Sequence, residues 1–387
     1  MDAERTIQVT VLTPSRFALL LAAAMTVSMA YGVTLPFLPF ILERVLQLGQ
    51  SGAIPWHTGL LTALYTLAMF FLSPLWGVLS DRFNRNVSSL TMLYASRMLS
   101  GIFAAAVLPA TLAYVAETCT AADRPRKFAI VASFTSLGFM LGPMIGGWLS
   151  SMVLLPPAGM RLAGVLMPDS PFFVIALLSI LCASGMVLLS VPHNQPRLTV
   201  VDEVMHTEKK RIRWALLLTL IAVFGVSTAE VGITLLGKQS LSLDPRAISQ
   251  FFVVCSMVMI TVQIGFFPLL MRKFSIPTLL VSAFILDAFG LGMIPYVMST
   301  QALDVLFGMI AVGTGILVPV LATVISQAAG QGQGKALGLQ TSAANLGQAI
   351  AAAATGALFF TAPAVPFLMS ASVLAVGAWI VSRIKIV

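Results

Sequence analysis

The sequence predicts an all-α integral membrane protein whose helices form two pseudo-symmetric bundles, and three observations carry that prediction. Hydrophobic residues make up 58% of the 387 residues and charged residues only 9%, whereas a soluble domain has about 25% charged residues. The apolar residues come in runs long enough to cross a hydrocarbon core of about 30 Å as helices. Finally, the two halves of the chain resemble each other. A soluble enzyme or nucleic-acid-binding protein is excluded, because no aqueous fold hides this much apolar surface.

Apolar runs of spanning length predict about eleven transmembrane helices, because helices satisfy their own backbone hydrogen bonds in lipid. In chain order they cover residues 17–42, 57–80, 93–116, 128–150, 170–191, 214–237, 247–270, 277–297, 302–325, 336–360 and 364–383. Residues 1–16 are polar and the run after them is too long for a cleaved signal peptide. We therefore expect the first span to be retained.

A long polar stretch, residues 192–213, divides the predicted spans into groups of five and six. It predicts an amino-terminal bundle (1–191), a cytoplasmic linker (192–213) and a carboxyl-terminal bundle (214–387). The net charge of +8 follows the positive-inside rule if the linker and both termini are cytoplasmic, because most Lys and Arg residues then fall on that side.

An internal repeat relates the two halves. The segment LGFMLGPMIGGWL, which begins at Leu137, resembles LGQAIAAAATGAL, which begins at Leu346 and lies 209 residues later. Pro109 and Pro319 match at an offset of 210 residues. Small residues recur at equivalent positions because transmembrane helices pack closely there, and parallel repeats of this kind are typical of transporters.

The first half is shorter than the second by about one span. Arg82-Phe83 matches Lys273-Phe274 at an offset of only 191 residues, so the third helix of a twelve-helix arrangement is missing before Pro109. The positive-inside pattern needs an even number of spans before Arg124, and three precede it. Three alternatives remain open: residues 86–116 fold back as a hairpin, the first two spans are inverted with the amino terminus outside, or the sequence is a deleted or misread form of a twelve-span parent.

Three local motifs follow one another along the first half. The turn after the second span reads GVLSDRFNR from Gly77 to Arg85, and its charged residues can form charge-assisted bonds with neighbouring helix ends. Arg97 lies in the next apolar run, where an arginine is costly and rarely without a role. The alternative interpretation is that the Arg97 side chain extends to the membrane–water interface. The candidate gating residues in the loop are Gly77, Asp81, Arg82 and Arg85.

The third motif is Gly138-xxx-Gly142-Pro143-xx-Gly146-Gly147. The proline removes a backbone hydrogen bond and kinks the helix, while the glycines let the kinked helix approach its neighbours. Such a helix suits a protein that rocks between two states.

In this order the three motifs resemble the GxLSDRxGR loop, the fourth-helix arginine and the GxxxGPxxGG motif of the major facilitator superfamily, in its drug–proton antiporter branch. Asn84 stands where the family loop has glycine. The resemblance implies a secondary transporter that exports a small solute or drug by alternating access, driven by protons, with Arg97 in the proton relay. It also implies a multi-pass protein of a bacterial inner membrane or a related internal membrane.

Two carboxyl groups lie within predicted spans, Glu230 and Asp287, and we expect them to serve proton coupling together with Arg97. An apolar medium disfavours the charged carboxylate, so such a group can bind and release a proton during transport. The first span contains no acidic residue before Glu43. Polar side chains within spans give candidate substrate contacts: Tyr31, Tyr65, Gln263, Gln340 and Asn345, with Phe37 and Gln348 as further candidates.

No phosphate-binding loop, Ser-His-Asp set or His/Cys cluster is present in the sequence, so neither an enzyme nor a metal or cofactor site is expected. The expected partners are the lipid bilayer, a small-molecule substrate and protons, without nucleic acid. Two other functions remain open. One is uptake, or transport across an organelle membrane, of a metal chelate or metabolite; the other is a transport-inactive membrane scaffold.

Overall fold

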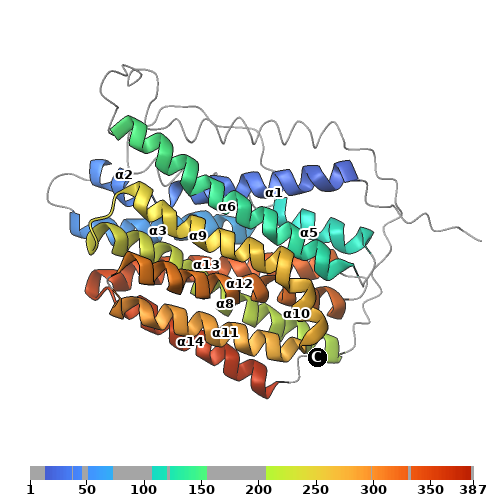
Figure 1. Ribbon diagram of the computed structural model, residues 1–387. Coiled ribbons are helices and arrows are strands. Elements are labelled where there is room, and N and C mark those ends of the chain that lie inside the picture. The colour runs from blue at the N-terminus through green and yellow to red at the C-terminus, as the bar shows by residue number, and fades with distance from the viewer. Residues whose placement is uncertain are drawn as a thin grey trace, which may run out of the picture.

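The computed structural model describes residues 14–36, 38–45, 51–72, 107–119, 123–154, 206–297, 299–329 and 333–384, which form helices joined by short turns (Figure 1). Eight helical segments in these ranges are long and apolar enough to cross a membrane. Each coincides with a predicted span, so the all-α membrane fold is confirmed. Of the other three predicted spans, 57–80 and 93–116 are described in part, and 170–191 lies outside the described residues.

The longer described helices of the first half lie side by side (Figure 1), and the short helix α2 follows the end of α1. The described helices of this half are α1 (Pro14–Thr34), α2 (Leu38–Val45), the 3-10 helix η1 (Ser51–Ala53), α3 (Ile54–Leu72), α5 (Val107–Thr118) and α6 (Arg124–Leu154).

The second half adds a longer series of helices that alternate in direction. They are α8 (His206–Gln239), α9 (Pro245–Thr261), the π-helix η3 (Val262–Phe266), α10 (Phe267–Lys273), α11 (Ile276–Met293), η4 (Ile294–Tyr296), α12 (Thr300–Ala328), α13 (Gln333–Thr361) and α14 (Val365–Arg383). Helix α8 begins inside the range predicted as a linker.

Local sequence signals explain where these helices begin. Asp244 precedes Pro245 and accepts a hydrogen bond from the Ala247 backbone N–H at 2.7 Å, which caps α9. Ser275 caps α11 in the same way, accepting from the Thr278 N–H at 3.4 Å. A capping side chain followed by proline at the first or second position satisfies amide groups that a helix start leaves free. These pairs therefore separate one span from the next.

The predicted internal repeat is confirmed by matching helix contacts in the two halves. A methyl group at Gly138 of α6 would collide with the carbonyl oxygen of Met25 on α1, and one at Gly347 of α13 would collide with the carbonyl oxygen of Leu220 on α8. Gly138 and Gly347 occupy equivalent positions in the repeat. Each half therefore uses glycine to bring an equivalent pair of backbones together.

Helices α1 and α6 run in the same direction. Gly138 faces Met25 and Gly142 faces Met29, one helical turn farther along both helices. The Lys127 ammonium, near the start of α6, also lies 4.5 Å from the centre of the Phe17 ring, near the start of α1. The layout with the first two spans inverted is therefore not the one in the structure. The hairpin alternative concerns residues 86–116, of which 86–106 lie outside the described part of the chain, so this alternative and the deleted-parent alternative stay open.

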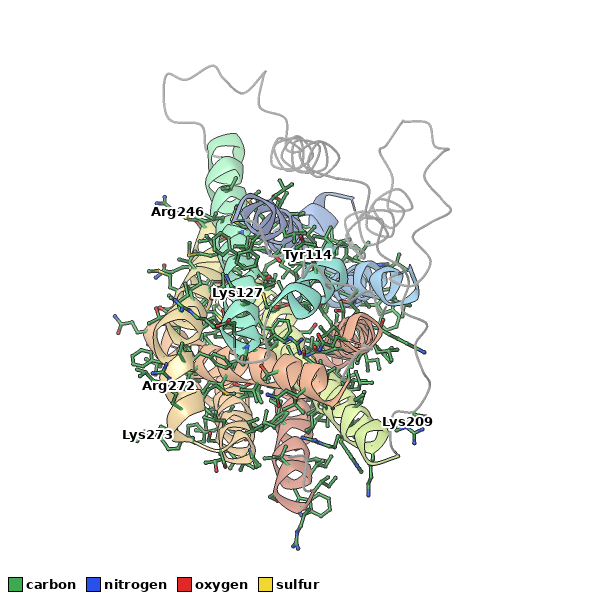
Figure 2. All side chains as sticks on the ribbon, turned by 90° about the vertical axis from the view of Figure 1, so that its right-hand side faces the viewer. Tyr114, Lys127, Lys209, Arg246, Arg272 and Lys273 are labelled. Carbon is green, nitrogen blue, oxygen red and sulfur yellow. The ribbon has the colours of Figure 1, made fainter. Side chains whose placement is uncertain are left out.

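Basic side chains gather at one end of the described helices, which we call the basic end. Figure 2 looks onto this end, and Lys127, Lys209, Arg272 and Lys273 are labelled there. Lys238 and Arg246 lie at the other end, where α8 finishes and α9 begins. We call this second end the outer end, because the positive-inside rule assigns the basic end to the cytoplasm.

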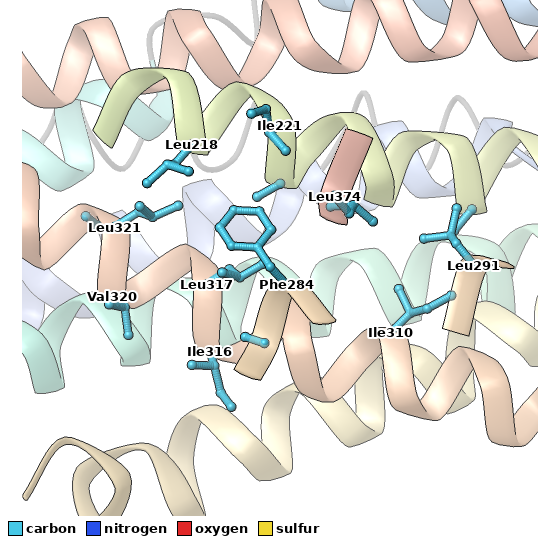
Figure 3. Packing of buried hydrophobic residues seen from close by; sticks show 14 of the residues in the cluster. Leu218, Ile221, Phe284, Leu291, Ile310, Ile316, Leu317, Val320, Leu321 and Leu374 are labelled. Atoms are coloured by element: carbon cyan, nitrogen blue, oxygen red, sulfur yellow. The ribbon is translucent and has the colours of Figure 1, made fainter. Parts of the chain in front are cut away.

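The core of the second half is packed with aliphatic and aromatic side chains (Figure 3). The fully buried Phe284 of α11 lies among Leu218 of α8, Leu317 of α12 and Leu374 of α14. On the outside, large apolar residues such as Ile264 and Trp379 are more than half exposed. An apolar exterior around a packed interior is the pattern that lipid contact requires.

We expect Gly138→Val to lower the thermal stability of the detergent-solubilised protein by several degrees, because the larger side chain forces α1 away from α6. Overpacking of this kind costs about 1–3 kcal/mol. Gly338→Val on α13 is the matched control, since nothing lies within 4 Å of a side chain added there. Equal melting temperatures for the two variants would contradict the close α1–α6 contact.

Candidate functional site

A short chain of hydrogen bonds joins the two halves in the interior of the molecule. The Tyr31 hydroxyl, on α1, donates to Glu230 Oε2, on α8, at 3.0 Å. Gln348 Nε2, on α13, donates to the Tyr31 oxygen, also at 3.0 Å. A first-half tyrosine therefore sits between two polar groups of the second half.

Aromatic rings line this contact. The Tyr31 ring stacks on Tyr65 of α3 with centroids 5.3 Å apart and on Phe139 of α6 at 5.9 Å. Phe139 in turn meets Phe252 of α9 edge-on, with centroids 5.5 Å apart. We call Tyr31, Tyr65, Phe139 and Phe252 the aromatic wall; it draws its rings from four helices and from both halves.

The site lies well inside the membrane-spanning region. Phe139 and Gln348 are each 15 residues from the first residue of α6 and α13, and both helices begin at the basic end. At about 1.5 Å per residue, the site is about 22 Å from that end. Glu230 has only 9% of its surface exposed and Tyr31 only 7%. A solute that reached this carboxyl would leave bulk water behind.

Glu230 has no basic partner within the described part of the chain, since the ion pair found there joins Lys238 to Glu43 instead. A carboxylate held in an apolar site without a counter-ion is costly. It is stabilised by taking up a proton or by pairing with a cation that enters the site.

The structure places Asp287 elsewhere. Thr314 Oγ1, on α12, donates to Asp287 Oδ2, on α11, at 3.2 Å, and Asp287 is 1% exposed. Its Oδ1 atom makes no hydrogen bond and lies against Gly313. Both neighbours belong to the second half, and no hydrogen bond among the described residues joins Asp287 to Tyr31 or Glu230, although the Cys255 thiol lies within electrostatic range of both carboxyl groups. Arg97, the third residue expected in proton coupling, lies outside the described residues.

The candidate substrate residues also lie in different parts of the structure. Tyr31 and Tyr65 lie in the aromatic wall, whereas Gln263 sits on the π-helix η3 and accepts a hydrogen bond from Ser136 of α6 at 3.4 Å. Gln340 and Asn345 are buried on α13, each with one side-chain atom that lacks a hydrogen-bond partner, and no hydrogen bond joins them to Tyr31. Phe37 lies outside the described residues.

The glycine and proline motif serves the packing of α1 on α6. A Cβ atom added to Gly32 would lie 2.9 Å from the Pro143 ring. One added to Gly142 would lie 2.5 Å from the Met29 carbonyl oxygen. Gly146 and Gly147 continue the same helix. The loop residues Gly77, Asp81, Arg82 and Arg85 lie outside the described residues. Their gating role therefore stays a prediction.

Three side chains of the site had no role assigned from the sequence: Phe139, Phe252 and Ser136. Phenylalanine and serine are common in every membrane helix, so their positions carried no signal of their own. Of the three, only Phe139 stands beside a residue, Gly138 of the glycine motif, that predicts close packing of two helices. Within the described ranges, no group of three His, Cys, Asp or Glu side chains could hold a metal ion.

Among the described residues, two of the contacts that join the halves at the outer end are especially close. The first centres on Lys238 of α8, whose ammonium donates to Glu43 Oε2 and to the Pro39 carbonyl oxygen of α2, both at 2.8 Å. The same ammonium lies 4.5 Å from the centre of the Phe40 ring. Its side chain is 12% exposed, against 61% for that of Glu43.

The second contact is a crossing of α3 and α13 at two glycines. A side chain on Gly59 would begin 2.7 Å from Gly356 Cα and 2.5 Å from the Ala352 carbonyl oxygen. The crossing is reciprocal, because a side chain on Gly356 would meet Gly59 Cα at 2.7 Å. The backbones of the two halves therefore touch directly here.

We expect Glu43→Lys to slow transport about two- to fivefold, because it replaces the ion pair to Lys238 with a repulsion of about 1 kcal/mol or less. The double variant Glu43→Lys/Lys238→Glu restores the attraction and should recover part of the lost rate. Transport rates of the three proteins in proteoliposomes provide the measurement. A double variant slower than Glu43→Lys alone would show that the charge pair does not hold this end together.

Comparison with known proteins identifies the family. The Major Facilitator Superfamily model matches residues 86–352. Among curated proteins, the chain is 26% identical over 394 aligned residues to multidrug resistance protein 2 of Bacillus subtilis, covering 93% of each protein. It is 23% identical over 377 residues to the quinolone resistance protein NorA of Staphylococcus aureus, covering 90% of this chain and 91% of that protein.

Solved structures share the fold at low sequence identity. The human organic anion transporter MFSD10 superposes with a TM-score of 0.66 at 15% identity, covering 96% of this chain and 100% of that one. FucP, a transporter in the outward conformation, gives a TM-score of 0.58 at 15% identity, covering 95% and 99%. With well over half of its length matched by the family model, the chain belongs to the Major Facilitator Superfamily and is a multi-pass membrane transporter.

Proposed function

We propose that this transporter exports drug-sized organic cations in exchange for protons, with Glu230 as the group that binds both. The observation that carries the proposal is the position of this carboxyl: it is buried at the contact between the halves, faces an aromatic wall, and has no basic partner in the described part of the chain. Two relatives are named for multidrug and quinolone resistance, which supports a large, apolar solute.

The exchange follows from charge neutrality at a buried site. A proton and an organic cation cannot both neutralise a single carboxylate, so binding of one displaces the other. The aromatic wall favours cations with delocalised charge, because ring faces attract positive charge and their area excludes water. If the site opens to opposite sides of the membrane in turn, proton entry then drives cation exit.

Asp287 has a different role in this proposal. Its contact with Thr314 and Gly313 ties α11 to α12 within the second half. Both neighbours move with it as the halves rock, so its surroundings change little between states. We therefore assign proton exchange to Glu230 and a packing role to Asp287.

Proteoliposomes loaded with acidic buffer and diluted into alkaline buffer with ethidium test the proposal. Protons leaving the lumen should drive ethidium inward, and accumulation should collapse when nigericin removes the pH gradient. Empty liposomes measure passive entry. If ethidium entry is the same with and without the gradient, for this and other lipophilic cations, proton-coupled cation exchange is wrong.

A further inference from the structure

The Tyr31 hydroxyl occupies a position with a specific chemical consequence. It accepts from Gln348 Nε2 and donates its single proton to Glu230 Oε2. A tyrosine hydroxyl has one proton to donate, and an ionised carboxylate is purely an acceptor. The arrangement suits the charged form of Glu230, while a protonated Glu230 could still accept the same bond through its carbonyl oxygen.

The strength of this bond depends on what Glu230 carries. A hydrogen bond to an ionised group is roughly twice as strong as one between neutral groups. When Glu230 takes up a proton, the Tyr31 bond loses its charge assistance, and a bound cation weakens the bond because it competes with Tyr31 for the same carboxylate. The bond is thus strongest when the carboxyl holds neither ligand.

The same bond joins the two halves, because Tyr31 belongs to α1 and Glu230 to α8. The Tyr31 ring is also held on the first-half side by Tyr65 and Phe139. Movement of one half against the other has to break the Tyr31–Glu230 contact or pull Tyr31 from its ring neighbours. An empty, charged site therefore resists that movement more than a loaded one.

We propose that Tyr31 is a positioning residue that locks the transporter when Glu230 is charged and empty, and releases it when a proton or a cation arrives. This inference rests on the proposed exchange at Glu230. Such a lock prevents the empty carrier from reorienting, which would let a cation cross without a returning proton. It therefore makes exchange obligatory, and it gives Tyr31 a role distinct from cation binding.

Other titratable groups near Glu230 bear on any pH dependence. In the described part of the chain they include the Tyr31 hydroxyl itself, the Tyr65 hydroxyl of α3 stacked on Tyr31, and the Cys255 thiol of α9, which lies within electrostatic range of both Glu230 and Asp287. The variants below are therefore made in a Cys255→Ser background, so that the Cys255 thiol does not contribute to the pH dependence assigned to Glu230.

Tyr31→Phe separates the lock from the ring contacts, since it removes the hydroxyl and keeps the aromatic stack. Two measurements in proteoliposomes are needed: uphill ethidium accumulation under a pH gradient, and downhill ethidium efflux at alkaline pH without a gradient. In the wild type we expect strong accumulation and slow downhill efflux. In Tyr31→Phe we expect downhill efflux to rise roughly tenfold and accumulation to fall, because a charge-assisted bond has been removed.

Two further variants sharpen the test. Gln348→Leu removes the donor that orients the Tyr31 hydroxyl, so it should shift both measurements in the same direction by less. Tyr296→Phe, at an exposed tyrosine of η4, is the matched control and should behave like the wild type. A purely structural role for Tyr31 would lower both fluxes together instead of raising one.

The outcomes separate this inference from the proposed function. If the wild type accumulates ethidium with the pH gradient and Tyr31→Phe keeps the wild-type ratio of uphill to downhill flux, the lock is overturned and the exchange at Glu230 stands. If the wild type shows no proton-driven accumulation, the proposed function fails and the lock fails with it.

Discussion

Glu230→Gln should abolish proton-driven ethidium accumulation, reducing it to the level of empty liposomes. Glutamine has nearly the shape of glutamate, and its amide oxygen can still accept the hydrogen bond from Tyr31. It carries no charge and binds no proton, so neither ligand of the exchange has a partner. The loss should therefore come without a loss of folded protein, which a melting curve in detergent measures.

Asp287→Asn is the control for this result. It changes a second buried carboxyl in the same chemical way, and the asparagine oxygen can still accept from Thr314. Because the described contacts of Asp287 are with Thr314 and Gly313 of its own half, we expect this variant to retain proton-driven accumulation. If Asp287→Asn loses accumulation and Glu230→Gln keeps it, the roles assigned to the two carboxyl groups are reversed.

Gly59→Leu should block transport while leaving cation binding intact. A leucine side chain would begin within 2.7 Å of Gly356 Cα and 2.5 Å of the Ala352 carbonyl oxygen, so α3 and α13 could no longer meet at the outer end. A transporter that cannot close this end cannot complete its cycle, whereas Glu230 and the aromatic wall lie deeper in the molecule. Ethidium binding in detergent and transport in proteoliposomes separate the two effects.

Three variants test whether the effect comes from this crossing. Gly356→Leu should produce the same loss, and the double variant should lose no more than either single one, because both substitutions break one contact. Gly52→Leu, near the start of α3, is the control, since a side chain there meets only Phe360 at an ordinary 3.5 Å. Loss of ethidium binding in Gly59→Leu would mean that the substitution disrupts the fold rather than the closure.

Much of the fold could be predicted because lipid imposes a simple length rule on each span. The apolar runs and the turns between them, such as Asp244-Pro245 and Ser275, fall where the described helices begin. The repeat was also readable, since Gly138 and Gly347 are needed for the same backbone approach in each half. The π-helix that carries Gln263 was not predictable, because a span that is apolar on most sides shows no sign in its sequence of the register shift that an extra residue in a turn produces.

The site was predictable only in part. Glu230 was identified because a carboxyl inside an apolar run is costly and therefore conspicuous. Its hydrogen-bond partner Tyr31 lies 199 residues away in the sequence, and no local pattern pairs residues at that distance. Asp287 carried the same signal as Glu230, and only the fold shows that its partner is Thr314 within its own half. An acidic residue in a span therefore indicates a polar contact, while the helix arrangement decides its role.

Proton release on cation binding tests the central claim most directly. Ethidium is added to detergent-solubilised protein in weakly buffered solution, and bound ethidium and released protons are measured together. The exchange predicts that the wild type releases protons as it binds ethidium, up to about one per cation as the pH is lowered and Glu230 becomes fully protonated, and that Glu230→Gln releases none. Ethidium binding to the wild type without proton release at any pH, or equal release from both proteins, would contradict it.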